Sequence, residues 1–474
     1  MKLEILNFFE NLEDTRKNKG KMYKLNDVII MSIFAILSGC KDATEIEYFL
    51  DLRKEYFTQL LDLKHGTPSH DTISHIFRII KPDKFIELFI EWVQEIVVQK
   101  NIGDIRTVAI DGKAIRSATD KINNGNVPYI VSAFATDLKI SIGQIKVDDK
   151  TNEIKAVPKL LDLIDIKGCV VTMDAMGTQK EIVKKIVKEK KGHYCLALKK
   201  NQGTLHWDVD EYFKFALEDK KTLKAAKNFN KEHGRIEERK CYVSNDVEFI
   251  QNLKDWKNLK SIIMVENYRE TGDDETRGKR YYISDLELSA EEFLKIIREH
   301  WEIENSLHWV LDVHFREDLS LSKKDNAIIN FSTVRKFCYN LTKFDEKLKH
   351  LTVKRRLANY QYDIKNIENS IKFCQNFAKM FHKIYNYSVI TGIENIEIVL
   401  EQKGYTVKTD YYTIKATANK KSETVSITKA LMLYSISKKA FDKDFEYSVK
   451  DTNSKIIEEI KQGIETFIIN KKQY

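Results

Sequence analysis

The stretch SAEEFLKIIREHWEIENSLHWVLDVHFRED, residues 289–318, decides how the rest of the chain is interpreted. Its apolar residues recur at steps of three and four, which is the period of an amphipathic helix. Ser289 followed by Glu292 matches a capping box, so the helix is predicted to begin there. Its polar face is unusual, because His300, Glu304 and His308 are spaced to form one stripe. We therefore interpret Glu304 as part of an active site whose other members lie far upstream.

Length and composition indicate a folded protein with several domains. A chain of 474 residues is too long for one typical core, and about two to four domains are expected. Hydrophobic content of 42% and aromatic content of 11% argue against wholesale disorder. Lys and Arg exceed Asp and Glu by 79 − 71 = 8, a mild excess that is compatible with a nucleic-acid partner.

Cysteine spacing and hydropathy suggest a cytoplasmic protein. The six cysteines are scattered without a CxxC pair, so zinc-site spacing is absent and a reduced setting is expected. No secretory signal is evident at the N-terminus. The longest apolar run, Val28–Leu37, has roughly half of the ~20 residues that a membrane span needs, so no membrane partner is expected.

Residues 1–100 are predicted to form a helical domain. The run Leu25–Leu37 is apolar nearly all round and should be a buried helix that ends at Ser38-Gly39. A second helix is predicted to start at Ser69, and Pro82–Val98 is a third amphipathic stretch.

From residue 101 to residue 204 the pattern changes to alternating strands and helices. Three strands with hairpin spacing are followed by helix, strand, helix and strand, the order of an RNase H-like mixed α/β domain. The strands are expected at Thr107–Ile110, Tyr129–Ala135, Ile140–Val147, Cys169–Met173 and His193–Lys199, and the helices at Val157–Leu163 and Glu181–Lys190.

The predicted fold class is therefore α/β, an RNase H-like mixed-sheet core with additions. Residues 205–285 are expected to form a β-rich insertion with short strands at Lys240–Val243, Ser261–Val265 and Arg280–Ile283. The core should resume over residues 286–366, which include the Glu304 helix and a helix at Asn326–Leu341. Residues 367–474 are assigned to a C-terminal α+β extension of unknown role.

Two further carboxylates complete the predicted site. Asp111 and Asp174 each follow an apolar strand directly, so neighbouring strands would present both at one end of the sheet. With Glu304 they would repel one another unless cations neutralise them. Hard oxygen ligands suit Mg²⁺ or Mn²⁺. Two such ions, ~4 Å apart, can activate a water or a 3′-hydroxyl and stabilise the leaving oxygen of a phosphodiester.

At this point several motifs carry a resemblance to a known family. The chain resembles the H repeat-associated, ISAs-type branch of the DDE transposases over roughly residues 1–360. The resemblance implies that Asp111, Asp174 and Glu304 are the catalytic and metal-binding triad of an RNase H-like core with a β insertion. It is carried by AIDGKAIR (109–116), NEIKAVPKLLDLI (152–164), VTMDAMGTQ (171–179), LALKKNQGTL (196–205), HGRIEER (233–239) and REHWEIENSLHWVLDVHFRED (298–318).

The chain also departs from the wider family pattern. DDE enzymes with a β insertion carry a Tyr, an Arg and a Lys around the Glu, and those positions here are Ile297, His300 and Leu311. The phosphate-binding role of that Arg would pass to His300 or Arg298. Trp301 and Trp309 are expected to pack in the core, with base stacking as the alternative.

Several polar residues near these motifs are candidates for DNA contact. Each has an alternative interpretation as an ordinary surface or core residue, because charge-rich loops are usually only solvated. The candidates are Lys113, Arg116, Gln179, Lys199, Lys200, Asn201, Arg235, Arg298, His300 and His308.

The resemblance implies a nucleoid-associated transposase that cuts element ends and joins the freed 3′-hydroxyl to target DNA. The N-terminal helical domain and parts of the C-terminal region would bind the DNA ends. The protein's partners would be double-stranded DNA and a second copy of the chain, with two Mg²⁺ or Mn²⁺ ions in each site and no small-molecule cofactor. Three alternatives stay open: a transposase-derived nuclease without strand transfer, a DNA-binding protein whose catalysis has decayed, and a metalloenzyme that uses His300 and His308 on small molecules.

Overall fold

The computed structural model describes the chain in two compact units. One unit contains residues 1–93 and 104–371, and the other contains residues 94–103 and 372–474. The domain boundaries expected near residues 100, 204, 285 and 366 stay predictions. The described residues are 9–16, 21–98, 107–115, 128–147, 153–219, 223–232, 235–271, 274–322, 324–371, 406–409, 413–418, 421–426 and 461–462.

The N-terminal part of the first unit is helical, as predicted. Every residue of α2 is buried, and the helix ends at Ser38 before Gly39, whose φ of 96° suits glycine. Ser69 caps α5 by accepting a hydrogen bond from the Thr72 amide. The helices of this part are α2 (Leu25–Leu37), α3 (Ala43–Asp51), α4 (Lys54–Leu61), α5 (His70–Ile79) and α6 (Pro82–Val98).

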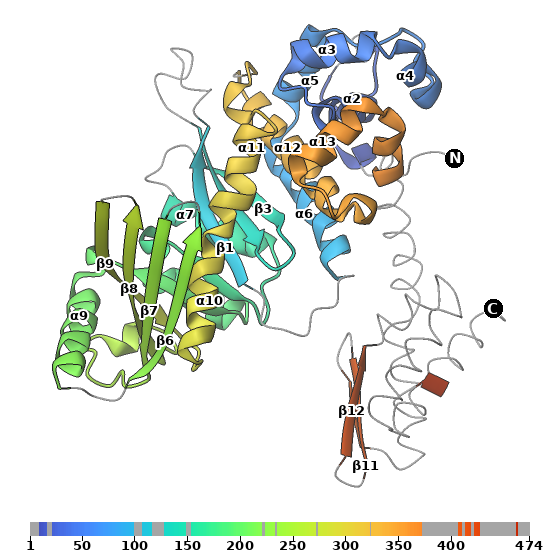
Figure 1. Cartoon of the computed structure of the whole chain (residues 1–474). Helices are drawn as coiled ribbons and strands as arrows, with labels where there is room; N and C mark the ends of the chain where they lie inside the picture. The colour runs from blue at the N-terminus through green and yellow to red at the C-terminus, as the bar shows by residue number, and fades with distance from the viewer. Residues whose placement is uncertain are drawn as a thin grey trace. The chain divides into compact units, whose positions relative to one another are not determined.

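These helices pack against α12 (Ala327–Phe344), which comes much later in the chain (Figure 1). The Phe77 and Phe331 rings stack with centroids 4.2 Å apart. Asn330 donates hydrogen bonds to the Phe77 and Ile80 carbonyls, at 2.8 and 3.0 Å. The helix α13 (Val353–Tyr362) also contacts α2 and α12.

The predicted RNase H-like sheet is present. Its core strands lie in the order β3-β2-β1-β4-β5, with β2 antiparallel to β1, β3 antiparallel to β2, and β4 and β5 parallel to β1. This arrangement matches the predicted order of a hairpin pair followed by crossover helices. The bounds are β1 (Thr107–Ala114), β2 (Tyr129–Ala135), β3 (Ile140–Val147), α7 (Glu153–Leu163), β4 (Val170–Met173), α8 (Lys180–Lys184) and β5 (His193–Leu198).

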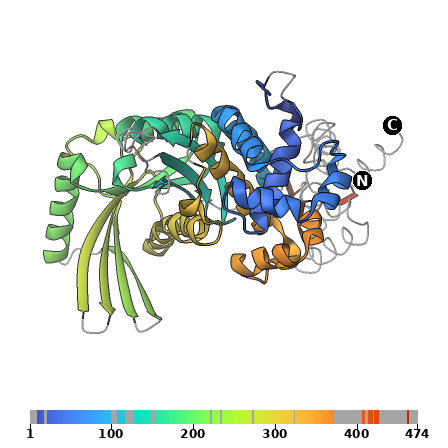
Figure 2. The same ribbon diagram turned by 90° about the horizontal axis from the view of Figure 1, so that it is seen from above.

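The insertion extends this sheet. Its last strand, β9, pairs antiparallel with β5, so four more strands continue the order as β9-β8-β7-β6 (Figure 2). The sequence predicted parts of three of these strands and missed β6 and the helix α9. The insertion contains α9 (Gly203–Glu218), β6 (Lys224–Glu232), β7 (Arg235–Ser244), β8 (Ser261–Thr271) and β9 (Asp274–Ser284).

The helix α10 (Ala290–His300) packs on one face of this extended sheet. The predicted capping box is confirmed, because Ser289 Oγ accepts from the Glu292 amide and the Glu292 carboxylate accepts from the Ser289 amide. Phe293 and Ile297 of the helix belong to one buried cluster with Cys241 and Val265 of the sheet. Burying these side chains fixes the helix beside β1, where the candidate site lies.

In the second unit, the described strands form a three-stranded antiparallel sheet, β10 (Thr406–Thr409), β11 (Thr413–Ala418) and β12 (Lys421–Ser426). The alternating stretch at Tyr405–Ala416 overlaps two of these strands. Among the described helices, none is long and apolar enough to cross a bilayer.

Candidate active site

Two neighbouring parallel strands bring Asp111 and Asp174 to the same end of the sheet. In the register of β1 with β4, Ile110 lies opposite Met173, so the two aspartates follow at the same level. The Asp174 side chain caps the short turn Ala175–Gly177 by accepting from the Met176 amide at 2.9 Å. The prediction that the first strand ends before Asp111 is wrong, because β1 continues to Ala114 and pairs with β2 there.

Glu304 reaches this site from a helix that changes its winding. After α10 the chain forms a π-helical segment at Ile303–His308 and then α11 (Trp309–Val313). A π-helical turn holds more residues than an α-helical turn, so side chains four apart no longer share one stripe. Glu304 is exposed, whereas His308 is buried. Repulsion between Glu304 and both aspartates places the three carboxylates within electrostatic reach.

The sequence missed a fourth carboxylate at this site. Glu153, the buried first residue of α7, acts on Asp111 electrostatically and hydrogen-bonds the Tyr129 hydroxyl. Burial, opposed by a hydrogen bond from Gly112 and reinforced by the neighbouring carboxylates, raises the pKa of Asp111 to about 7. The motif NEIKAVPKLLDLI contains Glu153, and it was the only signal for this residue in the sequence.

The two histidines are packed against the sheet as neutral groups. His300 Nδ1 lies 3.0 Å from the Thr172 hydroxyl, and burial lowers the pKa of His300 to about 4. His308 Nδ1 lies 3.6 Å from Asp111 Oδ2, and burial lowers the pKa of His308 to about 3. Both imidazoles are therefore uncharged near pH 7, so neither would bind a phosphate as a cation.

Lys113 is also enclosed by the protein. Its Nζ contacts Asp312 and lies 2.6 Å from Glu317 Oε2, and its side chain is 11% exposed. Although burial lowers the pKa of Lys113, the carboxylates of Glu317 and Asp312 outweigh that effect and raise it. Lys113 thus fixes β1 to the segment after α11, and a DNA contact from this position is not supported.

Polar side chains brace the turn that follows Asp174. Asn201 Nδ2 donates to the Ala175 carbonyl at 2.6 Å, and Gln179 Nε2 donates to the Met176 carbonyl at 3.1 Å. Gln202, which the sequence did not single out, donates to the Thr178 carbonyl at 2.9 Å. Lys199 and Lys200 beside them are exposed. The amides therefore position the Asp174 turn, and the two lysines stay candidates for phosphate contact.

The remaining candidates lie on the side of the insertion. Arg298 is exposed on α10 and donates to Asn228 Oδ1 of β6 at 2.9 Å. Arg235 begins β7, and Arg116 lies outside the described residues. The prediction that Trp301 and Trp309 pack in the core is wrong, because they are 40% and 52% exposed.

The three carboxylates suit a hard divalent cation, but their side chains do not converge on a single coordination site. Asp111, Asp174 and Glu304 offer only carboxylate oxygens, the ligands that Mg²⁺ and Mn²⁺ prefer. Within the described ranges no three His, Cys, Asp or Glu side chains are close enough together to hold one ion. Burial, together with the neighbouring carboxylates, raises the pKa values of Asp111 and Glu304.

Comparison with known proteins places the chain in a family. The profile described as "Transposase DDE domain" matches residues 102–341, and the profile described as "DDE_Tnp_1-associated" matches residues 6–93. "Putative transposase YncI" of Escherichia coli O157:H7 is 35% identical over 390 residues, which are 81% of this chain and 99% of that protein. "H repeat-associated putative transposase YhhI" of Escherichia coli strain K12 is 37% identical over 71% of this chain and 90% of its own length.

A distant match exists among solved structures. The piggyBac transposase in a synaptic complex with hairpin DNA aligns with 80% of this chain and 77% of its own chain, at 10% identity and a TM-score of 0.35. That similarity is too low to assign a shared fold by itself. The profile matches and the E. coli relatives are sufficient to assign the family. The chain belongs to the H repeat-associated branch of the DDE transposases.

Proposed function

We propose that this protein cuts DNA at the ends of an insertion sequence and joins the freed 3′-hydroxyl to target DNA. The observation that carries the proposal is the placement of Asp111 and Asp174 at the same level of adjacent parallel strands, with Glu304 coupled to both. In the cutting step a water oxygen would bond to the scissile phosphorus and the 3′-oxygen would leave. In the joining step that 3′-oxygen would displace an oxygen of a target phosphodiester.

Asp111, Asp174 and Glu304 are the residues that would hold divalent ions. Asp111, Asp174 and Glu304 would share the coordination of two such ions, and the two aspartates are the residues best placed to contact both. Such ions, when bound, supply activation of the attacking oxygen and stabilisation of the leaving oxygen. They would also offset the repulsion between the carboxylates, which adds to the effect of burial in raising the pKa values of Asp111 and Glu304.

The surrounding residues would orient these carboxylates. Asn201 and Gln179 hold the turn after Asp174, and the neutral His308 packs beside Asp111. Lys199, Lys200 and Arg298 are exposed cations that we retain as candidates for phosphate contact. Two DNA ends must be joined in one complex, so we also propose a homodimer on DNA, which light scattering of the complex with end DNA would detect.

The decisive experiment is a cleavage and strand-transfer assay on duplex DNA that carries the flanking ends of the encoding locus. Wild type is compared with Asp174→Asn and Glu304→Gln in Mg²⁺ or Mn²⁺. Asp219→Asn and Glu218→Gln, two exposed changes at the end of α9, are the matched controls. Joined products that disappear only in the site variants are the expected result. Cleavage without joining would instead identify a transposase-derived nuclease, and binding without cleavage in any metal would refute the catalytic assignment.

A further inference from the structure

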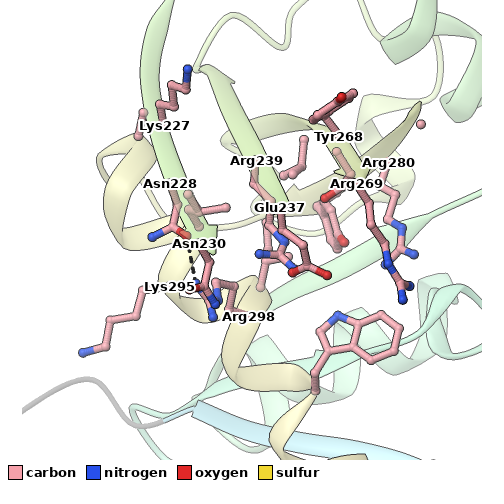
Figure 3. Close-up of a pocket in the computed structure, with 18 of the residues that line it drawn as sticks. Lys227, Asn228, Asn230, Glu237, Arg239, Tyr268, Arg269, Arg280, Lys295 and Arg298 are labelled. Carbon is pink, nitrogen blue, oxygen red and sulfur yellow. Dashed lines mark hydrogen bonds and ion pairs between the residues drawn. The ribbon is translucent and has the colours of Figure 1, made fainter. Parts of the chain in front are cut away.

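A groove runs along the insertion, beside the candidate active site. It has a volume of about 1010 Å³ and lies between the outer halves of β6–β9 and the helix α10 (Figure 3). The Glu304 segment closes one end, since Trp301, Glu302 and Asn305 line the groove together with the strands. One end of the groove therefore lies beside the helical segment that carries Glu304.

The sheet floor of the groove presents polar residues in regular rows. One row contains Asn228, Arg239, Asn267 and Gly278, which are direct partners across the four strands. Arg280 belongs to the row nearer the core, opposite Val265. Rows on one face of a sheet are roughly 7 Å apart, so cations recur along the groove at about that interval.

A further row lies farther from the core and contains Arg269 opposite Thr276. Gly278, in the row between Arg269 and Arg280, leaves open space, because a Cβ added there would meet nothing within 4 Å. Arg269 and Arg280 therefore both face the groove, and Gly278 of β9 places no side chain between them. Figure 3 shows both side chains reaching into the pocket from neighbouring strands.

The charge of the groove favours an anion. Eight of its lining side chains are Lys or Arg and four are Glu. Part of this charge is already balanced, because Arg239 pairs with Glu237, and Lys295 lies 3.8 Å from Glu299. Within the described ranges, Arg269, Arg280 and Arg298 form no ion pair. Three guanidinium groups are thus available to an external phosphate.

An aromatic surface accompanies these cations. Trp301 is 40% exposed, and the Arg280 guanidinium lies 5.3 Å from its ring centroid. Arg280 also acts on Glu304 electrostatically, which places the tryptophan at the site end of the groove. An exposed indole beside a guanidinium offers a base a stacking surface and a cation for its phosphate.

We propose that this groove binds a single strand of DNA that leads away from the scissile phosphate, an inference that rests on the proposed function. Rows of arginine for the phosphates, asparagine amides for base edges and a tryptophan for stacking are the chemistry of single-strand binding. The volume of about 1010 Å³ is close to the upper end for pockets that enclose small ligands, so it encloses a few nucleotides of one strand. Duplex DNA keeps its bases stacked inside and would leave Trp301 without a partner.

The test is equilibrium binding by fluorescence anisotropy in EDTA, so that cleavage plays no part. The probes are a fluorescein-labelled 12-nucleotide oligothymidylate, a duplex of the same length and poly-glutamate as a competing polyanion. The variants are Arg269→Ala and Trp301→Ala. Their matched controls are Arg355→Ala on α13 and Trp207→Ala on α9, two exposed residues outside the groove lining. Circular dichroism melting confirms that each variant is folded.

We expect both groove variants to weaken single-strand binding and both controls to leave it unchanged. Loss of one phosphate contact should reduce the slope of log affinity against log salt by about 0.7. Loss of a stacking ring should lower affinity roughly fivefold or more. The effect on the duplex probe should be smaller.

Three results would overturn the inference: no loss in either groove variant, equal loss for single strand and duplex, or displacement by poly-glutamate as effective as by DNA. None of these results depends on catalysis. Failure of the cleavage assay would therefore refute the proposed function and leave this binding result intact. Conversely, normal cleavage together with unchanged binding by both groove variants would refute only the groove.

Discussion

Replacing Glu317 with Gln should destabilise the first unit, because Glu317 is the buried carboxylate of a cationic network. Its side chain is 2% exposed, and its Oε2 lies 2.6 Å from Lys113 Nζ. Lys336 and Arg335 of α12 also interact with it electrostatically and are themselves buried. The substitution would leave Lys113 with Asp312 alone and would leave Lys336 and Arg335 without this carboxylate.

Removing one partner of a buried ion pair typically costs about 3–5 kcal/mol, because the remaining charge is left uncompensated. For a unit of this size, that cost corresponds to a fall of roughly 4–7 °C in the unfolding midpoint. The measurement is differential scanning calorimetry near pH 7. Glu181→Gln is the control, because Glu181 is 83% exposed and lies 3.5 Å from Lys184, a surface pair that contributes about 0–1 kcal/mol.

The pH dependence gives the same prediction an independent check. Despite its burial, Lys113 and the neighbouring cations hold the pKa of Glu317 far below its ordinary value of 4.5. Its stabilising effect is therefore complete above pH 4.5 and is lost as the pH falls toward the folded-state pKa. Wild type should lose stability over that range, and Glu317→Gln should lose less. A variant as stable as the Glu181→Gln control, or one with an unchanged acid profile, would refute this account of the network.

Three further changes follow from contacts in and around the site. Burial and the neighbouring carboxylates raise the pKa of Asp111 to about 7, so its ionisation destabilises the metal-free fold as the pH rises from 3.8 through 7. Asp111→Asn should therefore raise the melting temperature in EDTA at pH 8 by a few degrees, and a lower melting temperature would contradict this. Gly112→Ala places a Cβ 2.3 Å from Tyr129 Cε1 and should cost about 1–3 kcal/mol in urea unfolding, a loss that Tyr129→Ala in the same chain should reduce. Ser289→Ala removes the cap of α10 and should cost about 1 kcal/mol, whereas an unchanged urea midpoint would show that the capping box contributes nothing.

The parts of the fold predicted best are runs that are apolar throughout or along one face. The helices Leu25–Leu37 and Pro82–Val98 and the strands Tyr129–Ala135 and Ile140–Val147 have the predicted bounds. Each is an apolar or amphipathic run that ends at a turn or a cap, so local periodicity contains the information.

The insertion was harder to predict because β6 and the outer halves of β7, β8 and β9 are polar on both faces. In β6, Lys224 and Lys227 are exposed and Asn228 is only partly buried, so no alternation of apolar residues marks the strand. Pairing over the whole length of β7 stabilises it, and that pairing is a property of the tertiary structure.

At the site, the sequence predicted that the three acidic residues converge, and it missed their surroundings. Asp111 and Asp174 were predictable because strand ends in a parallel sheet share an edge. The π-helical segment could not be predicted, because the spacing of its apolar residues is that of a continuous α-helix. In the structure, this segment takes Glu304 out of the stripe predicted for it with His300 and His308. His308 is buried and His300 is partly buried because both contact the sheet, whereas Trp301 at the end of α10 stays exposed.

The electrostatics of the site lead to one further step. Glu153, Asp174 and Glu304 all act on the buried Asp111, so the site in its present form opposes full ionisation of that carboxyl. The largest opposing influence on Glu304 is Arg280, a residue of the insertion that also lines the groove. A phosphate bound at Arg280 would compete with Glu304 for the same positive charge and increase the need for cations at the carboxylates. DNA binding in the groove and metal binding at the site should therefore favour each other. The DNA phosphate would take up the positive charge of Arg280 that now acts on Glu304, and the metal ions would replace that positive charge at the carboxylates.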